Sequence, residues 1–263
     1  VPADPHVAVP MGGSTSLDAL NRQAVFHPSA PLAALRARFP RAEISYQDGR
    51  YPGAAAAAAR NADIAIVFAT QWMLENEDAA DLSLPGGQDA TIAAVADANP
   101  RTIVVLETGG AVLMPWLARV PAVLAAWYPG ERGGEAIADV LSGAVNPSGH
   151  LPISFPASET QAPARALRGL DLPAKQPFTV RYDEGADVGY RWYARHGQRP
   201  LFAFGHGLSY TAFAYDELRV RGGRAPRLSF VVRNTGTRAG KAVPQAYLTA
   251  IDGRPERRLI GWD

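Results

Sequence analysis

Apolar residues in the first 157 positions follow two alternating patterns. Continuous apolar runs of strand length lie at residues 64–68, 103–106, 122–127 and 151–155. Between these runs, apolar residues recur three or four positions apart at 88–98, 112–120 and 135–141. Strands that are apolar throughout and alternate with amphipathic helices are typical of a parallel sheet covered on both faces. The pattern therefore predicts a doubly wound, mostly parallel α/β sandwich domain over residues 1–157.

The chain before residue 64 has a more varied pattern. Residues 1–30 are rich in Pro and Gly, which predicts loops. Helical spacing follows at 32–39, and an alternating segment at 42–46 predicts a short strand. The stretch 54–61 begins with six consecutive alanines, and alanine has the highest helix propensity, so a second helix is expected there.

The pattern after residue 157 is different. We interpret residues 158–211 as a linker and connecting segment, with aromatic-rich strands at 178–182 and 189–193. Further strands are expected at 212–215, 228–233, 243–250 and 257–263, with a turn at the Asn-Thr-Gly of 234–236. Residues 212–263 therefore predict the opening of a small all-β sandwich. Since this sandwich is incomplete and the first residue is Val, we interpret the chain as a fragment of a longer protein.

Composition narrows the classes of partner. Of the 263 residues, 47% are hydrophobic and 19% are charged, with a formal net charge of +1. Because the basic residues are scattered, charge gives no support for a nucleic-acid partner, which needs clustered Lys and Arg. No run approaches the roughly 20 apolar residues of a membrane helix, so no membrane partner is expected. The lack of cysteine excludes disulfides and thiolate metal sites, and the five separated histidines suggest no other metal site.

The loop after the apolar run at 64–68 concentrates the candidate chemistry. Four carboxylates follow Trp72 within seven residues, namely Glu75, Glu77, Asp78 and Asp81. Burial beside an aromatic ring and like charge both raise the pKa of a carboxyl group, which is what a general acid requires. Acidic residues before a helix also serve as caps, so a structural role stays open. These residues alone do not distinguish Glu75 from Glu77.

Two Gly-rich turns, at 107–110 and 129–134, follow predicted strands and raise the alternative of a phosphate-binding loop. Neither turn has the spacing of a dinucleotide-binding fingerprint or of a Walker A loop, which ends in Lys and Ser or Thr. Glycines at such turns more often serve the backbone conformation. A Gly-x-Ser-x-Gly nucleophile motif is also missing from the sequence. No nucleotide cofactor is therefore expected.

Several motifs in order resemble glycoside hydrolase family 3. Residues 75–78 and 81–88, Glu-Asn-Glu-Asp and Asp-Leu-Ser-Leu-Pro-Gly-Gly-Gln, resemble the family's acid/base loop, usually Glu-Gly-x-Asp-Arg followed by Leu-x-Leu-Pro and Gln. The resemblance continues through 112–117, 126–130, 133–134, 146–156, 182–185, 188–193 and 200–211. The Asn-Thr-Gly of 234–236 resembles the start of the fibronectin type III-like domain that closes many of these enzymes. The resemblance to the family covers about four-fifths of the chain.

The resemblance implies a three-part enzyme, in which a barrel carrying an Asp nucleophile precedes the α/β sandwich and a fibronectin type III-like domain. Glu75 falls on the position of the family's general acid/base, and Glu77 on a variable one. Trp72 and Asp78 are then expected to contact substrate or support the loop. Two departures concern this loop, since Asn76 replaces the usual Gly and Ala79 the usual Arg.

The activity that this resemblance implies is a retaining, exo-acting β-glucosidase that removes terminal β-linked glucose from oligosaccharides or glucosides. The expected partners are that substrate and the enzyme's own N-terminal barrel, with no metal or other cofactor. A periplasmic or secreted location is implied as well. The alternative is a non-catalytic carbohydrate-binding or assembly module.

Overall fold

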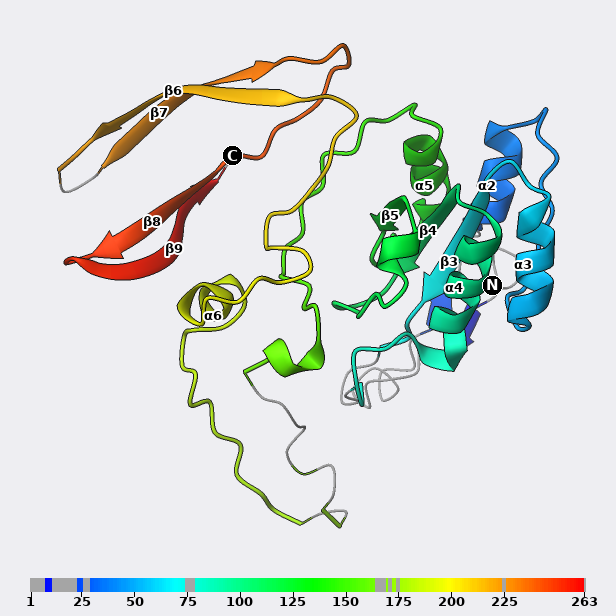
Figure 1. Cartoon of the computed structure of the whole chain (residues 1–263), viewed down its shortest axis with the longest axis horizontal. Helices are drawn as coiled ribbons and strands as arrows, with labels where there is room; N and C mark the ends of the chain where they lie inside the picture. The colour runs from blue at the N-terminus through cyan, green and yellow to red at the C-terminus, as the bar shows by residue number, and fades with distance from the viewer. Residues whose placement is uncertain are drawn as a thin grey trace. The chain divides into compact units, whose positions relative to one another are not determined.

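The computed structural model describes residues 29–73, 79–163, 169, 172–173, 176–223 and 226–262, together with the backbone of 8–10 and 23–25 (Figure 1). Contacts divide the chain into two compact units. The first comprises Val1–Asp139 and Pro156–Leu170, and the second comprises Val140–Phe155 and Asp171–Asp263.

A three-stranded parallel sheet forms the centre of the first unit (Figure 1). Its strands, in the order β3-β4-β5, are β3 (Ala65–Thr70), β4 (Thr102–Glu107) and β5 (Ala122–Ala125). The register pairs Ala65 with Thr102 and Thr70 with Glu107, so β3 and β4 end together at one edge. The parallel α/β arrangement predicted from the apolar runs is confirmed, and ligands of such sheets bind beyond the carboxyl ends of the strands.

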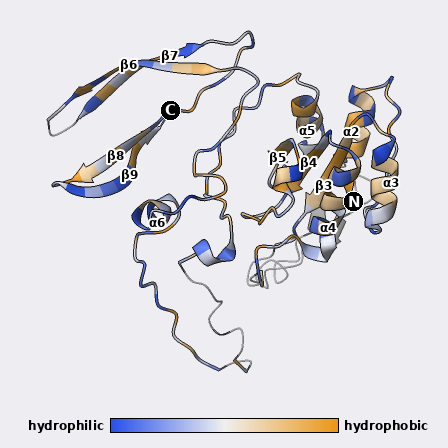
Figure 2. Cartoon of the chain, in the orientation of Figure 1, coloured by the Kyte–Doolittle hydropathy of each residue, from blue (hydrophilic) through white to orange (hydrophobic). Residues whose placement is uncertain are grey.

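Helix α4 (Gln88–Ala98) joins β3 to β4 and has the predicted bounds. Its residues Ile92, Val95 and Ala96 are buried, which is the i, i+3, i+4 spacing of a helix with one apolar face. Helix α3 (Pro52–Arg60) packs against α4 through Ala55 and Ala59, whose small side chains allow a close approach. Figure 2 shows the apolar residues of this unit gathered on the sheet strands.

The remaining helices of the first unit are α2 (Pro31–Arg38) and α5 (Gly133–Leu141), both close to the predicted segments. The short 3-10 turns are η1 (Pro85–Gly87), η2 (Leu117–Arg119) and η3 (Glu159–Gln161). A two-stranded antiparallel pair, β1 (Ala8–Pro10) and β2 (Gln23–Val25), lies in the region expected to be loop.

Two further predictions for this unit were wrong. The segment 112–120 is not a helix, because only η2 forms there. Pro115 lacks the N–H that a helix needs and disfavours helical geometry in the residue before it. The apolar spacing has another cause, since Val112 and Trp116 are buried in the core from an irregular chain. The segment 42–46 forms no strand and is mostly exposed, so its alternation has no partner strand or core to face.

The described residues of the second unit form one helix and two antiparallel hairpins. These are α6 (Tyr190–Arg195), the pair β6 (Phe213–Arg221) and β7 (Arg227–Asn234), and the pair β8 (Gln245–Ile251) and β9 (Arg254–Trp262). The strands expected at 212–215, 228–233, 243–250 and 257–263 are therefore confirmed, each somewhat longer or shifted by a few residues.

Three other strand predictions in this unit were wrong. The stretch 178–182 is irregular, and 189–193 belongs to α6 instead. Gly189 begins that helix with a φ of 56°, and an ion pair between Asp187 and Arg191 spans its first turn. The run at 151–155 contributes only a bridge between Phe155 and Phe202, since Pro152 cannot donate a ladder hydrogen bond.

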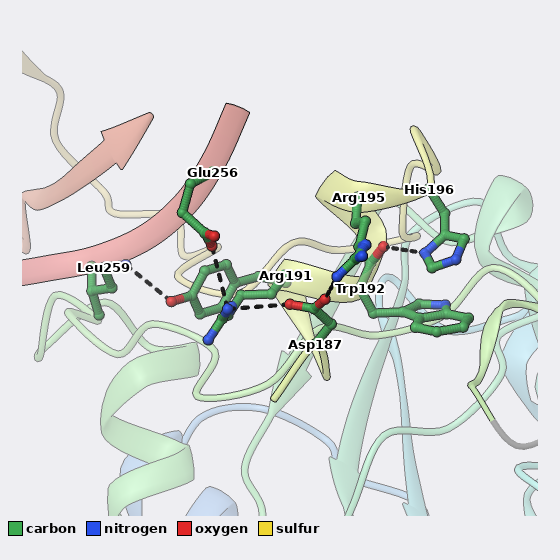
Figure 3. A network of polar contacts seen from close by, with 8 residues as sticks. Asp187, Arg191, Trp192, Arg195, His196, Glu256 and Leu259 are labelled. Carbon is green, nitrogen blue, oxygen red and sulfur yellow. Dashed lines mark hydrogen bonds and ion pairs between the residues drawn. The ribbon is translucent and has the colours of Figure 1, made fainter. Parts of the chain in front are cut away.

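A polar network connects α6 with β9 (Figure 3). The Arg191 guanidinium lies 3.2 Å from Asp187 and 3.3 Å from Glu256 of β9. The Leu259 N–H donates a hydrogen bond of 3.0 Å to the Tyr190 hydroxyl, whose ring packs against Tyr247 of β8. These charged side chains are only 15–27% exposed, so removing one partner would leave the other charge half-buried and unpaired. The network therefore fixes the β8–β9 hairpin to α6.

Candidate active-site loop

The candidate loop runs from the end of β3 to the start of α4. Glu75 and Asp78, two of the three residues predicted for the site, lie in the segment 74–78, outside the described residues. Glu77, the alternative to Glu75, lies there too. The third predicted residue, Trp72, is 82% exposed. An indole so exposed contributes little to the core, so it is free to contact a ligand.

Gln88 ties the two ends of this loop together. Its side-chain oxygen accepts a hydrogen bond from the Thr70 N–H at 2.8 Å. Its side-chain nitrogen donates to the Thr70 carbonyl at 2.7 Å and to the Pro85 carbonyl at 2.8 Å. The amide thus pairs with β3 as a neighbouring strand would. The preceding Gly86 and Gly87 both have positive φ, of 67° and 75°, which explains why glycine occupies this turn.

The chain that enters the loop is fixed at Gln71. Its N–H donates to the Glu107 carbonyl at 3.1 Å, which extends the ladder between β3 and β4 by one residue. Its carbonyl accepts a hydrogen bond of 2.6 Å from the Tyr128 hydroxyl. Gln71 is only 6% exposed, and its side-chain oxygen has no hydrogen-bond partner among the described residues.

The chain that leaves the loop is fixed by several contacts. The Ser83 N–H donates to Asp81 at 2.8 Å, and the Leu82 N–H donates to Glu159 at 3.3 Å. The Leu82 carbonyl accepts a hydrogen bond of 2.8 Å from the Leu113 N–H, and Leu84 is buried. Asp81, which the acidic cluster made a candidate for chemistry, therefore has a structural role as a turn acceptor.

Asp89, in the first turn of α4, binds the core behind the loop. One of its oxygens accepts a hydrogen bond of 2.7 Å from the indole N–H of Trp116, which is 1% exposed. The other oxygen accepts a weaker bond of 3.4 Å from the Leu84 N–H. The motif residues around Pro115 thus support the end of the loop from below, a role that spacing along the sequence did not indicate.

One further acid lies at the same edge of the sheet. Glu107 ends β4 opposite Thr70, and partial burial raises the pKa of its carboxyl group. Among the described residues, no cluster of three or more His, Cys, Asp or Glu side chains could hold a metal ion. No helix in the described part of the chain is long and apolar enough to cross a membrane.

The last two glycines of the Gly-rich turn at 129–134 are buried and closely packed. A Cβ at Gly134 would lie 2.5 Å from the Ser29 carbonyl, and one at Gly133 would lie 2.5 Å from Pro129. The Gly134 N–H, at the start of α5, already donates to the Ser29 hydroxyl at 2.8 Å. Gly133 and Gly134 therefore serve close packing, not the special backbone conformation that was expected, and the first N–H groups of α5 face the Ser29 hydroxyl.

The model of the glycosyl hydrolase family 3 C-terminal domain matches residues 5–210 of this chain. The chain is 42% identical over 221 residues to beta-glucosidase B of Emericella nidulans, covering 78% of this chain and 26% of that protein. It is 43% identical over 206 residues to a beta-glucosidase of Rhizobium radiobacter, covering 76% of this chain and 25% of that protein. The chain thus spans about a quarter of the length of the curated relatives it matches.

Solved structures of beta-glucosidases are similar to this chain as well. DesR, a beta-glucosidase from Streptomyces venezuelae in complex with D-glucose, is 46% identical, with a TM-score of 0.73 over 81% of this chain and 28% of that chain. The beta-glucosidase D2-BGL from Chaetomella raphigera is 28% identical, with a TM-score of 0.81 over 92% of this chain and 38% of that chain.

Proposed function

This chain belongs to glycosyl hydrolase family 3, and we propose that it supplies the general acid/base, Glu75, of a retaining, exo-acting β-glucosidase. The substrate in this proposal is an oligosaccharide or glucoside with a terminal β-linked glucose. The observation that carries the proposal is that the family model spans the whole 70–88 loop, and that relatives at 42–46% identity are named beta-glucosidases.

The position of the loop supports an acid/base role. It follows β3 at the carboxyl edge of a parallel sheet, where ligands bind in folds of this class. Its two ends are fixed by Gln88, Gln71 and Leu82, as described above. A loop with fixed ends can present a carboxyl group to a neighbouring domain with little loss of conformational entropy on binding. The exposed Trp72 offers an aromatic face for the leaving sugar, and Asp78 is assigned to loop support or substrate contact.

The reaction needs two carboxyl groups about 5–5.5 Å apart. An Asp on a barrel domain outside this chain attacks the anomeric carbon, while protonated Glu75 donates its proton to the glycosidic oxygen and the aglycone leaves. Ionised Glu75 then takes a proton from water, whose oxygen attacks the anomeric carbon and releases the Asp. Together the two steps return the proton to Glu75 and free the Asp carboxylate, so the reaction in this proposal uses no metal or other cofactor.

The domain organisation in this proposal follows the family. Residues 1–157 form the α/β sandwich, 158–211 the connecting segment, and 212–263 the first part of a fibronectin type III-like domain. The hairpins β6–β7 and β8–β9 support the last assignment, since such sandwiches are built from antiparallel pairs. A periplasmic or secreted location completes the proposal.

The test is Glu75→Gln in the full-length enzyme, with Glu77→Gln as the matched control. We expect Glu75→Gln to lower kcat/KM for cellobiose by about 10²–10⁴-fold, the usual contribution of a general acid. For dinitrophenyl β-glucoside, whose leaving group needs no proton, the loss in kcat/KM is expected to be much smaller. Azide should accelerate turnover of that substrate by Glu75→Ala, because it attacks the glycosyl intermediate without a general base. Glu77→Gln should leave kcat/KM unchanged for both substrates.

A reversed result, with the selective loss in Glu77→Gln and none in Glu75→Gln, would show that the acid/base assignment is wrong. Binding of glucosides without any hydrolysis by the wild-type full-length protein would instead favour the non-catalytic carbohydrate-binding module.

A further inference from the structure

The hydrogen bond between Tyr128 and Gln71 joins two loops that are far apart in sequence. Tyr128 follows β5 and Gln71 follows β3, with β4 between the two strands. We propose that Tyr128 is a positioning residue, which holds the chain entering the candidate loop so that Glu75 reaches the glycosidic oxygen. This inference rests on the proposed function of Glu75.

The contact with Tyr128 fixes the end at which the chain enters the loop. The Tyr128 hydroxyl donates to the Gln71 carbonyl at 2.6 Å, while the Gln71 N–H is held by the Glu107 carbonyl at 3.1 Å. The backbone N–H of Gln71 is therefore bound at the end of β4, and its carbonyl is bound by a residue that follows β5. Half of the Tyr128 side chain is exposed, so its hydroxyl can be removed without opening the core.

Gly109, in the turn after β4, lies where these loops meet. A Cβ at this position would lie 2.8 Å from the Met73 sulfur and 2.9 Å from the Tyr128 hydroxyl oxygen. Any side chain there would have to displace Met73, Tyr128 or both. Met73, Gly109 and Tyr128, from the loops after β3, β4 and β5, therefore lie close together, and with Gln71 they form one group, which we call the loop seat.

The backbone immediately before Tyr128 is in an unfavourable conformation. Trp127 has a φ of 55°, in the left-handed region. A bulky non-glycine residue there costs on the order of 1–3 kcal/mol and persists only where the surroundings require it. Trp127 immediately precedes Tyr128, so the strained residue lies directly beside the one whose hydroxyl reaches Gln71.

Covalent reach explains why this seat matters for Glu75. Met73 is two residues before Glu75, and two residues span at most about 7 Å. Ala79, where the described chain resumes, is four residues away and allows about 14 Å. The entering chain therefore restricts the position of Glu75 much more tightly than the leaving chain does. Proton transfer is sensitive to such placement, and a 1 Å displacement can cost about 100-fold in rate.

The experiment compares Tyr128→Phe with the wild type in the full-length enzyme. We expect kcat/KM for cellobiose to fall about tenfold, since the proton donor is less well placed. For dinitrophenyl β-glucoside, which leaves without protonation, kcat/KM should change by less than about twofold. Tyr46→Phe is the control, because Tyr46 is exposed in the same unit and its hydroxyl has no hydrogen-bond partner among the described residues. It should change neither value.

Gly109→Ala provides a second, independent disturbance of the loop seat. Its methyl group should displace the Tyr128 hydroxyl or Met73, and it should produce the same selective loss on cellobiose. Combined with Tyr128→Phe, the two losses should be less than multiplicative, because both act through one contact. Thermal unfolding of each variant is measured alongside, so that a reduced folded fraction is recognised.

An equal loss on both substrates in Tyr128→Phe, or no loss on either, would overturn the positioning role. The same panel includes Glu75→Gln, which separates the two proposals. If Glu75→Gln is selective and Tyr128→Phe is not, only the positioning role fails. If Glu75→Gln shows no selectivity, the acid/base assignment fails and the positioning role, which depends on it, fails with it.

Discussion

Strands β4 and β7 are both rich in Val and Leu, yet their surroundings differ. In β4, Val104, Val105 and Leu106 are 0% exposed. In β7, Phe230, Val231 and Val232 are 37–40% exposed. Strand β4 is the middle of a parallel sheet with helices packed against it, whereas β7 pairs with β6 alone among the described strands. An apolar composition therefore favours a strand in both regions, but the strand becomes part of the core only where other elements cover it.

The largest effect that sharpens this comparison is expected from Leu106→Ala. Removing a fully buried side chain leaves a cavity, so the free energy of unfolding should fall by about 2–5 kcal/mol. Leu228→Ala in β7, where Leu228 is 39% exposed, is the matched control and should cost less than about 1 kcal/mol. Urea denaturation of both variants provides the measurement. Similar losses at the two positions would mean that β7 is covered in solution.

A smaller effect is expected where α4 is attached to the core beneath the sheet edge. Asp89→Ala leaves the buried indole N–H of Trp116 without its acceptor, which should cost about 1–3 kcal/mol. Asp97→Ala on the same helix removes only an exposed ion pair with Arg119 and should cost at most about 1 kcal/mol. Denaturation followed by Trp fluorescence compares the two. A loss as large for Asp97→Ala would contradict the role of Asp89 as the hydrogen-bond acceptor for the buried Trp116.

The smallest effect concerns Glu107, the partly exposed last residue of β4. Burial raises its pKa in the folded state above the usual 4.5. Below pH 4.5 the carboxyl group is protonated in both the folded and the unfolded state. As the pH rises from 4.5 to the folded pKa, the unfolded state loses its proton before the folded state does. Wild-type stability should therefore decline slightly over this range. Glu107→Gln removes the decline, so the difference in urea midpoint should grow in favour of the variant from about pH 4 to pH 7. A pH-independent difference would exclude this cause.

Much of the fold could be predicted from local pattern. The helix at 88–98 and the strands around 64–68 and 103–106 were found because period and propensity agree there with the final packing. The failures have the opposite cause. At 112–120, a four-residue apolar spacing reflects an irregular chain that inserts Val112 and Trp116 into the core. At 189–193, aromatic content suggested a strand, while the local Asp187–Arg191 pair and Gly189 favour a helix.

The candidate site divides in the same way. The resemblance of its motifs leads to Glu75, with Trp72 and Asp78 beside it, and the choice of Glu75 over Glu77 stays a prediction because both lie outside the described residues. Neither spacing nor motif indicated the loop seat. Tyr128 and Gln71 are 57 residues apart, and no local pattern reports a hydrogen bond over that separation.

What the sequence determined by itself is therefore the alternation of strands and helices and the family to which the chain belongs, since both are written in short, local runs of residues. Only the tertiary structure decided which loops meet at the carboxyl edge of the sheet and which apolar strands become core. The reason is that parallel pairing brings the ends of β3, β4 and β5 together regardless of their distance along the chain, so that contacts such as Tyr128 with Gln71 exist only after folding.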